Sequence, residues 1–274
     1  MFNVKIKRFY DTEQIQIFSQ GMRSKGEVEK EQKVDVFTGE ILKYNCHYDR
    51  CYNPFTDEVE YLECEPDTKE SSRISASRTI HKIYDIARSN YWEWFLTFTF
   101  SPEKVKDRTD YKELSSKLSN WLSRMRKECP DMVYLVVPEL HKDGKSYHFH
   151  GLFANIDNLG LVDSGKVDKN GNIIYNVGSY KFGFTTAERI RDLGRSCSYL
   201  SKYITKDLCA VTKGKKRYWS SRNVQLPEVQ ELHLEASEVD RIRIFMQGST
   251  YVKSVQSPYT DVTYIERSLT DAPE

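Results

Sequence analysis

Hydrophobic and polar positions alternate differently along the chain, and the alternation divides it into expected helices and strands. Residues 73–90 and 110–127 carry apolar side chains at spacings of three and four, which predicts two amphipathic helices. Runs of β-branched and aromatic residues at 94–100, 133–139 and 147–153 predict three buried strands. Helices and strands mixed in this order predict an α+β fold.

The remaining pattern is weaker. Two short β-type runs, 34–37 and 41–44, flank a turn signal, and polar stretches at 65–72 and 157–172 predict loops. Residues 197–208 predict a third helix, because their apolar side chains recur at helical spacing.

Composition and charge narrow the classes of protein that fit this pattern. Of 274 residues, 39% are hydrophobic and 30% are charged, which is typical of a globular protein and excludes a wholly disordered one. No apolar run approaches the ~20 residues that cross a bilayer, so we expect no membrane association. The six cysteines are scattered, which favours a reduced cytoplasm over a disulfide framework.

The net charge of +1 results from a cancellation along the chain. Residues 181–222 carry eleven Lys and Arg against three acidic residues, a local net charge of +8. Residues 224–274 carry nine acidic residues against four basic ones, a local net charge of −5. The basic segment could bind a polyanion, although the whole chain would not attract one through its net charge.

One expected strand carries two histidines that could bind a metal. His148 and His150 are two residues apart, so their side chains leave the same face of the strand while Phe149 leaves the other. A two-residue turn at Asp143-Gly144 would set Glu139 directly opposite His148, with Cβ atoms about 5 Å apart. Two imidazoles and a carboxylate with open positions suit Mg²⁺ or Mn²⁺ acting on a phosphate, or zinc or iron in other chemistries.

His141 would project from the same face as these residues, one step nearer the turn. It could replace Glu139 as the third ligand or assist it. The alternative interpretation of the whole pattern is a half-buried strand without a metal.

The expected third helix carries two stripes of different chemistry. At 100° per residue, one stripe is apolar, and the other holds tyrosines and lysines at positions i, i+3, i+4 and i+7. The apolar stripe consists of Leu200, Ile204 and Leu208, and the second stripe of Tyr199, Lys202, Tyr203 and Lys206. We expect the apolar stripe to face the core, so the tyrosines would emerge on a surface with two cations. That surface could attack a phosphate through a phenolate, or bind phosphates without chemistry.

These three segments, in this order, resemble the motifs of the HUH endonuclease superfamily. The resemblance is to replication initiator proteins of rolling-circle replication in bacterial plasmids and small single-stranded-DNA phages. It rests on Phe95 to Phe100, on Glu139 to His150 and on Tyr199 to Lys206, and it covers residues 73–226. The segment Lys216 to Asn223 is also similar to one seen in phage-type members.

The resemblance implies a fold of the HUH/RRM-like type and a set of site residues. The fold would be a central antiparallel sheet of about five strands flanked by helices. His148, His150 and Glu139 would bind Mn²⁺ or Mg²⁺, with His141 in question. Tyr199 or Tyr203 would attack the scissile phosphate and form a 5′-phosphotyrosine. By the same analogy, the second tyrosine would act at termination and Lys202 would lie near the phosphate.

We expect the DNA to be single-stranded at the nick and to follow the basic segment. Cations would contact its phosphates, and two aromatic rings would stack on its bases. The residues expected there are Lys206, Lys213, Lys215, Lys216, Arg217, Tyr218, Trp219 and Arg222, with Lys181, Arg189, Arg191 and Arg195 beside them. A solvated basic turn is the alternative for residues 213–217.

The chain is therefore expected to divide into an N-terminal extension (1–72), a nickase domain (73–226) and an acidic C-terminal segment (227–274). Its expected partners are origin DNA and a host helicase, in the cytoplasm of a bacterial host. A relaxase or a single-strand transposase would use the same chemistry. An origin-binding protein without catalysis is a further alternative. An iron oxygenase would leave the tyrosine–lysine stripe unexplained.

Overall fold

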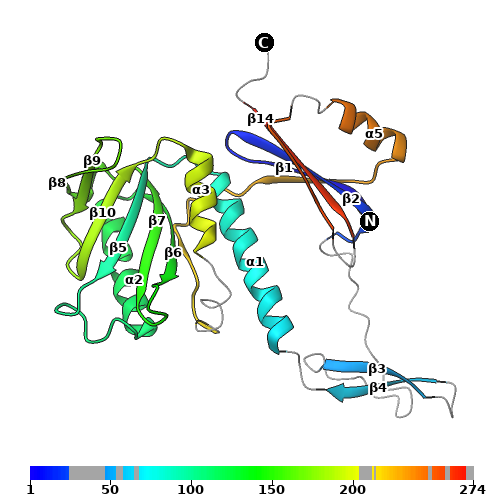
Figure 1. The fold of residues 1–274 in the computed structure, drawn as a ribbon, viewed down its shortest axis with the longest axis horizontal. Helices are drawn as coiled ribbons and strands as arrows, with labels where there is room; N and C mark the ends of the chain where they lie inside the picture. Colours follow the sequence, from blue (N-terminus) through cyan, green and yellow to red (C-terminus); the bar gives the residue numbers. More distant parts are fainter. Residues whose placement is uncertain are drawn as a thin grey trace.

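In a computed structural model, the chain has an α+β fold with two larger antiparallel sheets (Figure 1). The structure describes residues 1–24, 47–53, 58–64, 68–203, 212, 214–245, 249–256 and 260–269. The expected fold class is confirmed, but the described strands form two larger sheets and a two-stranded hairpin where one sheet was expected. The sheet that contains the expected strands has seven strands, two more than expected. Among the residues described, no helix is long and apolar enough to span a membrane.

The larger sheet has seven strands in the order β11-β6-β7-β5-β10-β9-β8. Its strands are β5 (Trp94–Phe100), β6 (Val133–Leu140), β7 (Tyr147–Ala154), β8 (Leu161–Val167), β9 (Ile173–Val177), β10 (Gly183–Arg189) and β11 (Trp219–Ser220). All its neighbouring pairs are antiparallel. The three strands expected from the sequence, β5, β6 and β7, lie side by side near its centre.

The helices near this sheet are α1 (Thr68–Arg88), α2 (Tyr111–Glu128) and α3 (Leu193–Lys202), with a short 3₁₀ turn at Asp157–Leu159. Helix α2 begins after Asp110, whose side chain accepts hydrogen bonds from the backbone N–H groups of Lys112 and Glu113. The expected apolar stripe of α2 is buried, and Trp121 packs against Phe98 of β5 with ring centroids 5.1 Å apart. Helix α3 lies on the other side of the sheet, next to α1 (Figure 1).

The five-stranded sheet is built from both ends of the chain. Its order is β12-β1-β2-β14-β13. The strands are β1 (Phe2–Arg8), β2 (Thr12–Met22), β12 (Glu228–Leu232), β13 (Tyr251–Val255) and β14 (Val262–Ser268), with helix α5 (Ala236–Phe245) beside them. Val4, Ile15, Ile17 and Ile265 form its small core together with Val239 of α5. The expected N-terminal extension and acidic C-terminal segment therefore share one sheet. A separate hairpin pairs β3 (His47–Asn53) with β4 (Glu58–Cys64).

Helix α1 joins the two larger sheets. Lys7 Nζ of β1 forms an ion pair with Asp85 Oδ1 at 2.8 Å, and the Tyr84 hydroxyl donates to Glu266 Oε1 at 3.2 Å. Arg88, at the end of α1, donates to Thr12 Oγ1 at 2.7 Å. These contacts are partly buried, so they are less exposed to screening by water and salt than surface pairs.

Several expected boundaries are wrong. The polar stretch 65–72 was expected to be a loop, but α1 begins at Thr68, since polar side chains are compatible with the first turn of a helix. The loop expected at 157–172 contains β8, a largely exposed strand with a bulge after Asp163 that hides the alternation. Helix α3 starts at Leu193, four residues earlier than expected. Residues 204–208 and the β-type runs at 34–44 lie outside the described residues.

Candidate active site

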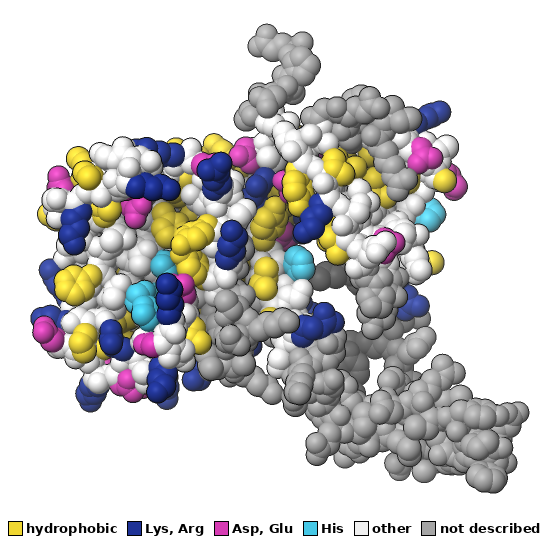
Figure 2. Space-filling view, viewed as in Figure 1, with side chains coloured by type: hydrophobic (Ala, Val, Ile, Leu, Met, Phe, Trp, Pro, Cys, Tyr) yellow, Lys and Arg dark blue, Asp and Glu magenta, His cyan; other side chains and the backbone are white. Residues whose placement is uncertain are grey.

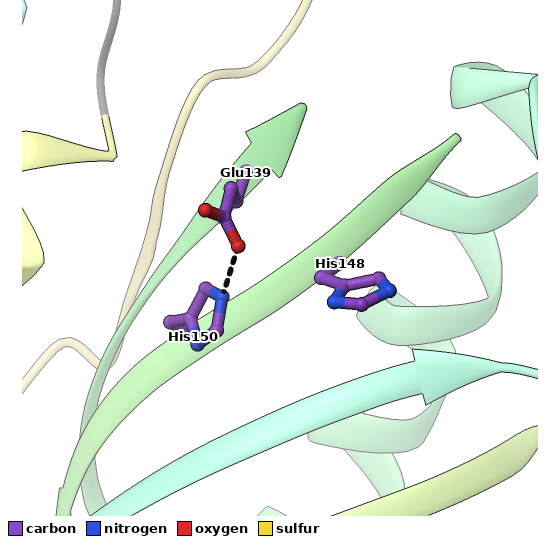
Figure 3. Close-up of side chains that lie close together, drawn as sticks. All are labelled: Glu139, His148 and His150. Atoms are coloured by element: carbon purple, nitrogen blue, oxygen red, sulfur yellow. Dashed lines mark hydrogen bonds and ion pairs between the residues drawn. The ribbon is translucent and has the colours of Figure 1, made fainter. Parts of the chain in front are cut away.

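The register between β6 and β7 brings two histidines and a glutamate together. Glu139 of β6 lies directly opposite His148 of β7, as the sequence predicted. The ligand atoms of Glu139, His148 and His150 all lie within 4.8 Å of one another, and Figure 3 shows the three side chains converging on one face of the sheet. His150 Nε2 and Glu139 Oε2 are 2.7 Å apart and form a hydrogen bond.

The turn that sets this register is longer than the two residues expected. The N–H of Gly144 donates to the carbonyl of His141 at 2.8 Å, and the N–H of His141 donates to the carbonyl of Ser146. Gly144 has a φ of +69°, a left-handed conformation that glycine adopts without strain. Asp143 caps the turn by accepting from the N–H groups of Lys145 and Ser146. Both turns are centred on Asp143-Gly144, so the same residues of β6 and β7 face each other and the register is unchanged.

Strand alternation separates the site from the core. Phe149, between the two histidines, points to the opposite face and packs against Phe100 with ring centroids 5.7 Å apart. Thr97 of β5 lies opposite His150, and its Oγ1 is 3.1 Å from His150 Nδ1. The Thr97 hydroxyl therefore holds the His150 ring so that Nε2 faces Glu139.

The protonation states favour metal binding. The hydrogen bond from His150 lowers the pKa of Glu139 in spite of its partial burial, and the nearby charges of His150, His148 and His141 add to this effect. Burial lowers the pKa of His148, and the charges of His141 and His150 lower it further. A metal needs an ionised carboxylate and neutral imidazoles, and the shifts favour the first at Glu139 and the second at His148. The donor set suits Mn²⁺ or Mg²⁺ as well as zinc or iron.

His141 stands next to this cluster without belonging to it. Its ring centroid lies 4.8 Å from that of His148, but its Nδ1 is 3.8 Å from Asp143 Oδ2 in the turn. The residues that could hold a metal together are Glu139, His148 and His150. The structure thus gives no support to His141 as a replacement for Glu139.

Two tyrosines at the end of α3 lie beside the cluster, and one of them stacks on the imidazole of His150. The ring of Tyr203, the residue directly after α3, stacks on His150 with centroids 4.0 Å apart and planes 7° apart. Tyr199 packs one turn earlier, with its ring centroid 5.0 Å from that of Tyr203 and 5.8 Å from that of Phe95. Tyr199 is 50% exposed, whereas Tyr203 is 9% exposed.

The expectation that both tyrosines emerge on the surface is therefore wrong for Tyr203. Helix α3 has two covered faces, because it lies between the sheet and α1. Leu200 is fully buried as expected, and Cys197 Sγ donates to the carbonyl of Ala87 in α1. The tyrosine face covers the metal-binding cluster of the sheet. Burial raises the pKa of Tyr203 well above its usual value, and its hydrogen bond with Tyr199 adds to the effect.

A groove of about 810 Å³ opens beside these side chains. Its floor includes Phe95, Thr97, His150, Tyr199 and Tyr203. Its walls carry cations, namely Arg88, Arg189, Arg191, Arg195 and Lys202, together with Asp168 and Glu188. Figure 2 shows histidine side chains on this face of the part of the molecule that contains the seven-stranded sheet, beside a hydrophobic patch and among Lys and Arg. The groove can hold a phosphate-bearing strand against the cluster.

Two residues of this site, Thr97 and Arg88, were not predicted from the sequence. Thr97 could have been found, since the alternation of Phe and Thr in β5 puts Thr97 on the face opposite the buried Phe98. No pattern in the sequence around Arg88 indicates that it lines the groove, because its position depends on how α1 packs next to α3.

The basic residues expected to bind DNA form a second groove of about 550 Å³. Lys215, Lys216, Arg217 and Tyr218 line it with Ser75 and Thr79 of α1. Arg222 lies exposed beyond β11. Lys206 and Lys213 lie outside the described residues.

Trp219 was expected to stack on bases, and this is wrong. It is 2% exposed in β11, packs against Phe149, and donates its Nε1–H to Ser119 Oγ at 2.8 Å. The polar and basic residues around Trp219 in the sequence suggested a surface position. Its side chain instead covers the core at the edge of the sheet, on β11. Its ring has no free face for a base.

Residues 93–208, less than half of the chain, match the model of a family described as Replication-associated protein ORF2. The matched segment begins just before β5 and ends after α3, so it contains the whole metal-binding cluster. No curated protein and no solved structure matches the chain.

Proposed function

Because residues 93–208 match the Replication-associated protein ORF2 family, we propose that the chain is a replication initiator that nicks and rejoins single-stranded DNA at a specific site. The family match supports the role in replication and the binding of DNA. The observation that carries the nickase chemistry is the stack of Tyr203 on His150, which joins the tyrosines of α3 to the metal-binding cluster. Neither feature alone would indicate this reaction.

Glu139, His148 and His150 would hold Mn²⁺ or Mg²⁺. The bound ion would supply Lewis-acid polarisation of the scissile phosphate. Thr97 and Tyr203 hold the ring of His150 from its edge and its face, so this ligand is positioned before any ion binds. The cluster lies on adjacent strands of a sheet, which is more rigid than a loop.

The reaction would be a transesterification that conserves the number of phosphoester bonds. The tyrosine oxygen forms a bond to phosphorus, and the bond from phosphorus to the 3′ oxygen breaks. The tyrosine loses its proton, and the 3′ oxygen gains one and becomes the free hydroxyl that primes synthesis. Because one ester replaces another, the step is reversible without a further energy source, so the same site can rejoin DNA.

We assign the first attack to Tyr199. It is half exposed to the groove, so a phosphate can reach its hydroxyl without movement of α3. Tyr203 is buried on His150, and burial raises its pKa, which keeps it a neutral phenol. Tyr203 would act in the second transfer, after the first transfer has left DNA attached to Tyr199 in the groove. Lys202 lies on the groove wall between the two tyrosines in sequence and would contact the scissile phosphate.

The arginines of the groove would hold the phosphates on either side of the nick. Arg189 and Arg191 lie on one wall and Arg195 on α3. The second groove, with Lys215, Lys216 and Arg217, would bind DNA farther from the nick. An isolated iron site would not need these cations, which disfavours an oxygenase. A host helicase remains a predicted partner.

The proposal is tested by incubating the protein with Mn²⁺ and single-stranded oligonucleotides tiled across the replicon that encodes it. We expect a protein–DNA adduct that resists denaturant, formed with oligonucleotides from one region of the replicon. Binding of that region without an adduct under any divalent ion would indicate an origin-binding protein without catalysis and would refute the nickase.

A further inference from the structure

Two tyrosines form an exposed pair where the two larger sheets meet. Tyr10 lies between β1 and β2, and Tyr91 lies between α1 and β5. Their ring centroids are 5.8 Å apart with planes inclined by 42°, and each side chain is 56% exposed. Aromatic rings of this size normally bury most of their surface, so a pair left this open is available to a ligand.

The pair is anchored through Arg88, which also lines the groove of the active site. The N–H of Tyr10 donates to the carbonyl of Arg88 at 3.1 Å, and Tyr91 follows Arg88 by three residues. The guanidinium of Arg88 is itself part of the groove wall. Arg88 therefore contacts the turn that carries Tyr10 through its carbonyl, and its side chain lines the groove along which a DNA strand would run.

The β1–β2 turn that carries Tyr10 also approaches α3. The pKa of the Cys197 thiol in α3 is raised to about 12, chiefly by burial, with the charge of Arg88 opposing the shift and those of Asp11 and Asp192 adding to it. The link is Arg88, which donates to Thr12 Oγ1 at 2.7 Å beside this turn and lines the groove together with Gly194 of α3. Gly194 and Arg195, in the first turn of α3, line the groove together with Arg88.

The pair is not needed to hold the two sheets together. That junction is formed by Lys7 with Asp85, by Tyr84 with Glu266 and by Phe9, whose ring packs edge-on against Tyr84 with centroids 5.9 Å apart. Phe9 is 5% exposed, as expected for a residue that closes an interface. Its neighbour Tyr10 contributes little further burial and keeps its ring in solvent.

We propose that Tyr10 and Tyr91 form a stacking platform for unpaired bases of the DNA strand as it leaves the groove. This proposal rests on the proposed function, because it requires single-stranded DNA in the groove. The ligand class is a nucleobase, recognised by its π face without a sequence requirement. The platform would give the terminal sheet, which lies outside residues 93–208, a part in binding DNA.

The test compares tyrosine variants that keep or remove the aromatic ring. Tyr10→Leu with Tyr91→Leu keeps apolar bulk, whereas Tyr10→Phe with Tyr91→Phe keeps the rings. Tyr251→Leu is the matched control, since Tyr251 is 47% exposed on β13 at the far edge of the same sheet. Affinity is measured with fluorescent oligo(dT) of graded lengths and with duplex DNA of the same lengths.

We expect the double Leu variant to lose roughly tenfold or more in affinity for long oligo(dT), the size of one or two lost base stacks. Its affinity for the shortest oligo(dT) and for duplex DNA should match the wild type. The double Phe variant and Tyr251→Leu should bind normally at every length. Equal affinity of the Leu and wild-type proteins for long oligo(dT) would overturn the platform. The platform would also be overturned if the double Phe variant lost as much affinity as the double Leu variant, or if the double Leu variant lost as much affinity for duplex DNA as for long oligo(dT).

Failure of the platform and failure of the nickase give different results. If the Leu variant binds long oligo(dT) normally while the wild type forms the covalent adduct, the platform is refuted and the nickase stands. If the wild type binds oligo(dT) with the predicted dependence on length but forms no adduct, the platform stands as a feature of a binding protein.

Discussion

The ring of Tyr203 lies flat on the imidazole of His150, with centroids 4.0 Å apart and planes 7° apart. Through this contact the residue that follows α3 covers one of the three residues that could hold a metal. Replacing Tyr203 with Leu should free the His150 ring and weaken Mn²⁺ binding by roughly tenfold, the lower end of the range for residues that orient a ligand. Tyr203→Phe keeps the stack and should bind Mn²⁺ like the wild type. Isothermal titration calorimetry distinguishes them, and equal affinities in both variants would show that the stack does not position His150.

The Thr97 hydroxyl should orient the same imidazole from its edge. Thr97→Val removes the 3.1 Å contact to His150 Nδ1 but keeps the shape of the side chain. We expect a roughly tenfold loss of Mn²⁺ affinity, and Thr97→Ser should restore it. His141→Ala serves as a second control and should leave the affinity unchanged, since His141 lies outside the cluster. An effect of His141→Ala as large as that of His148→Ala would contradict the assignment of ligands.

The arginines of the groove predict a dependence of DNA binding on salt. Each phosphate contact to a single strand contributes about 0.7 to the slope of log K against log salt concentration. Arg191→Ala should reduce the slope by about that amount if Arg191 contacts one phosphate. Lys253→Ala is the control, because Lys253 is an exposed cation on β13 of the other sheet. A slope unchanged by Arg191→Ala would place the strand elsewhere.

Tyr180 should make the fold sensitive to alkaline pH. Burial raises the pKa of Tyr180 far above its usual value of about 10, whereas the unfolded chain keeps that value. Above pH of about 10 the unfolded state loses the proton first, so the free energy of unfolding falls as pH rises. Its hydroxyl has no hydrogen-bond partner within the described part of the chain.

Tyr180→Phe should therefore raise the free energy of unfolding by roughly 1 kcal/mol at neutral pH, because it removes a buried polar group without a partner. Its thermal stability should also fall less steeply above pH of about 10 than that of the wild type. Thermal melts across pH test both statements, with Tyr251→Phe as the exposed control. A variant that is less stable at neutral pH would imply that the hydroxyl is satisfied.

Local rules were sufficient to predict that Glu139, His148 and His150 lie together. Alternation placed His148 and His150 on one face, and the turn set Glu139 opposite His148. Both are short-range properties of a hairpin, so they do not depend on the rest of the fold. The same reasoning failed for Tyr203, because a helical wheel shows one apolar face and cannot show that α3 is covered on a second side.

The terminal sheet could not be predicted for a different reason. Val4 pairs with Leu232, and Ile15 pairs with Ile265. Contacts between residues so far apart in the chain leave no periodic signal near either partner. The acidic character of the C-terminal segment suggested a tail, but its charged residues are compatible with the exposed strand β12, while Ile265 of β14 and Val239 of α5 contribute to the small core.

In the proposed reaction, a tyrosine at the end of α3 becomes covalently bound to DNA next to the cluster on β6 and β7. The most direct measurement is mass spectrometry of tryptic peptides from an adduct formed with Mn²⁺ and a cleaved single-stranded oligonucleotide. We expect a nucleotide attached through a 5′ phosphate to Tyr199 in the wild type, and no adduct in Tyr199→Phe, in Tyr199→Phe combined with Tyr203→Phe, or in His148→Ala. An adduct on any other residue, or one that persists in the double variant, would contradict this expectation.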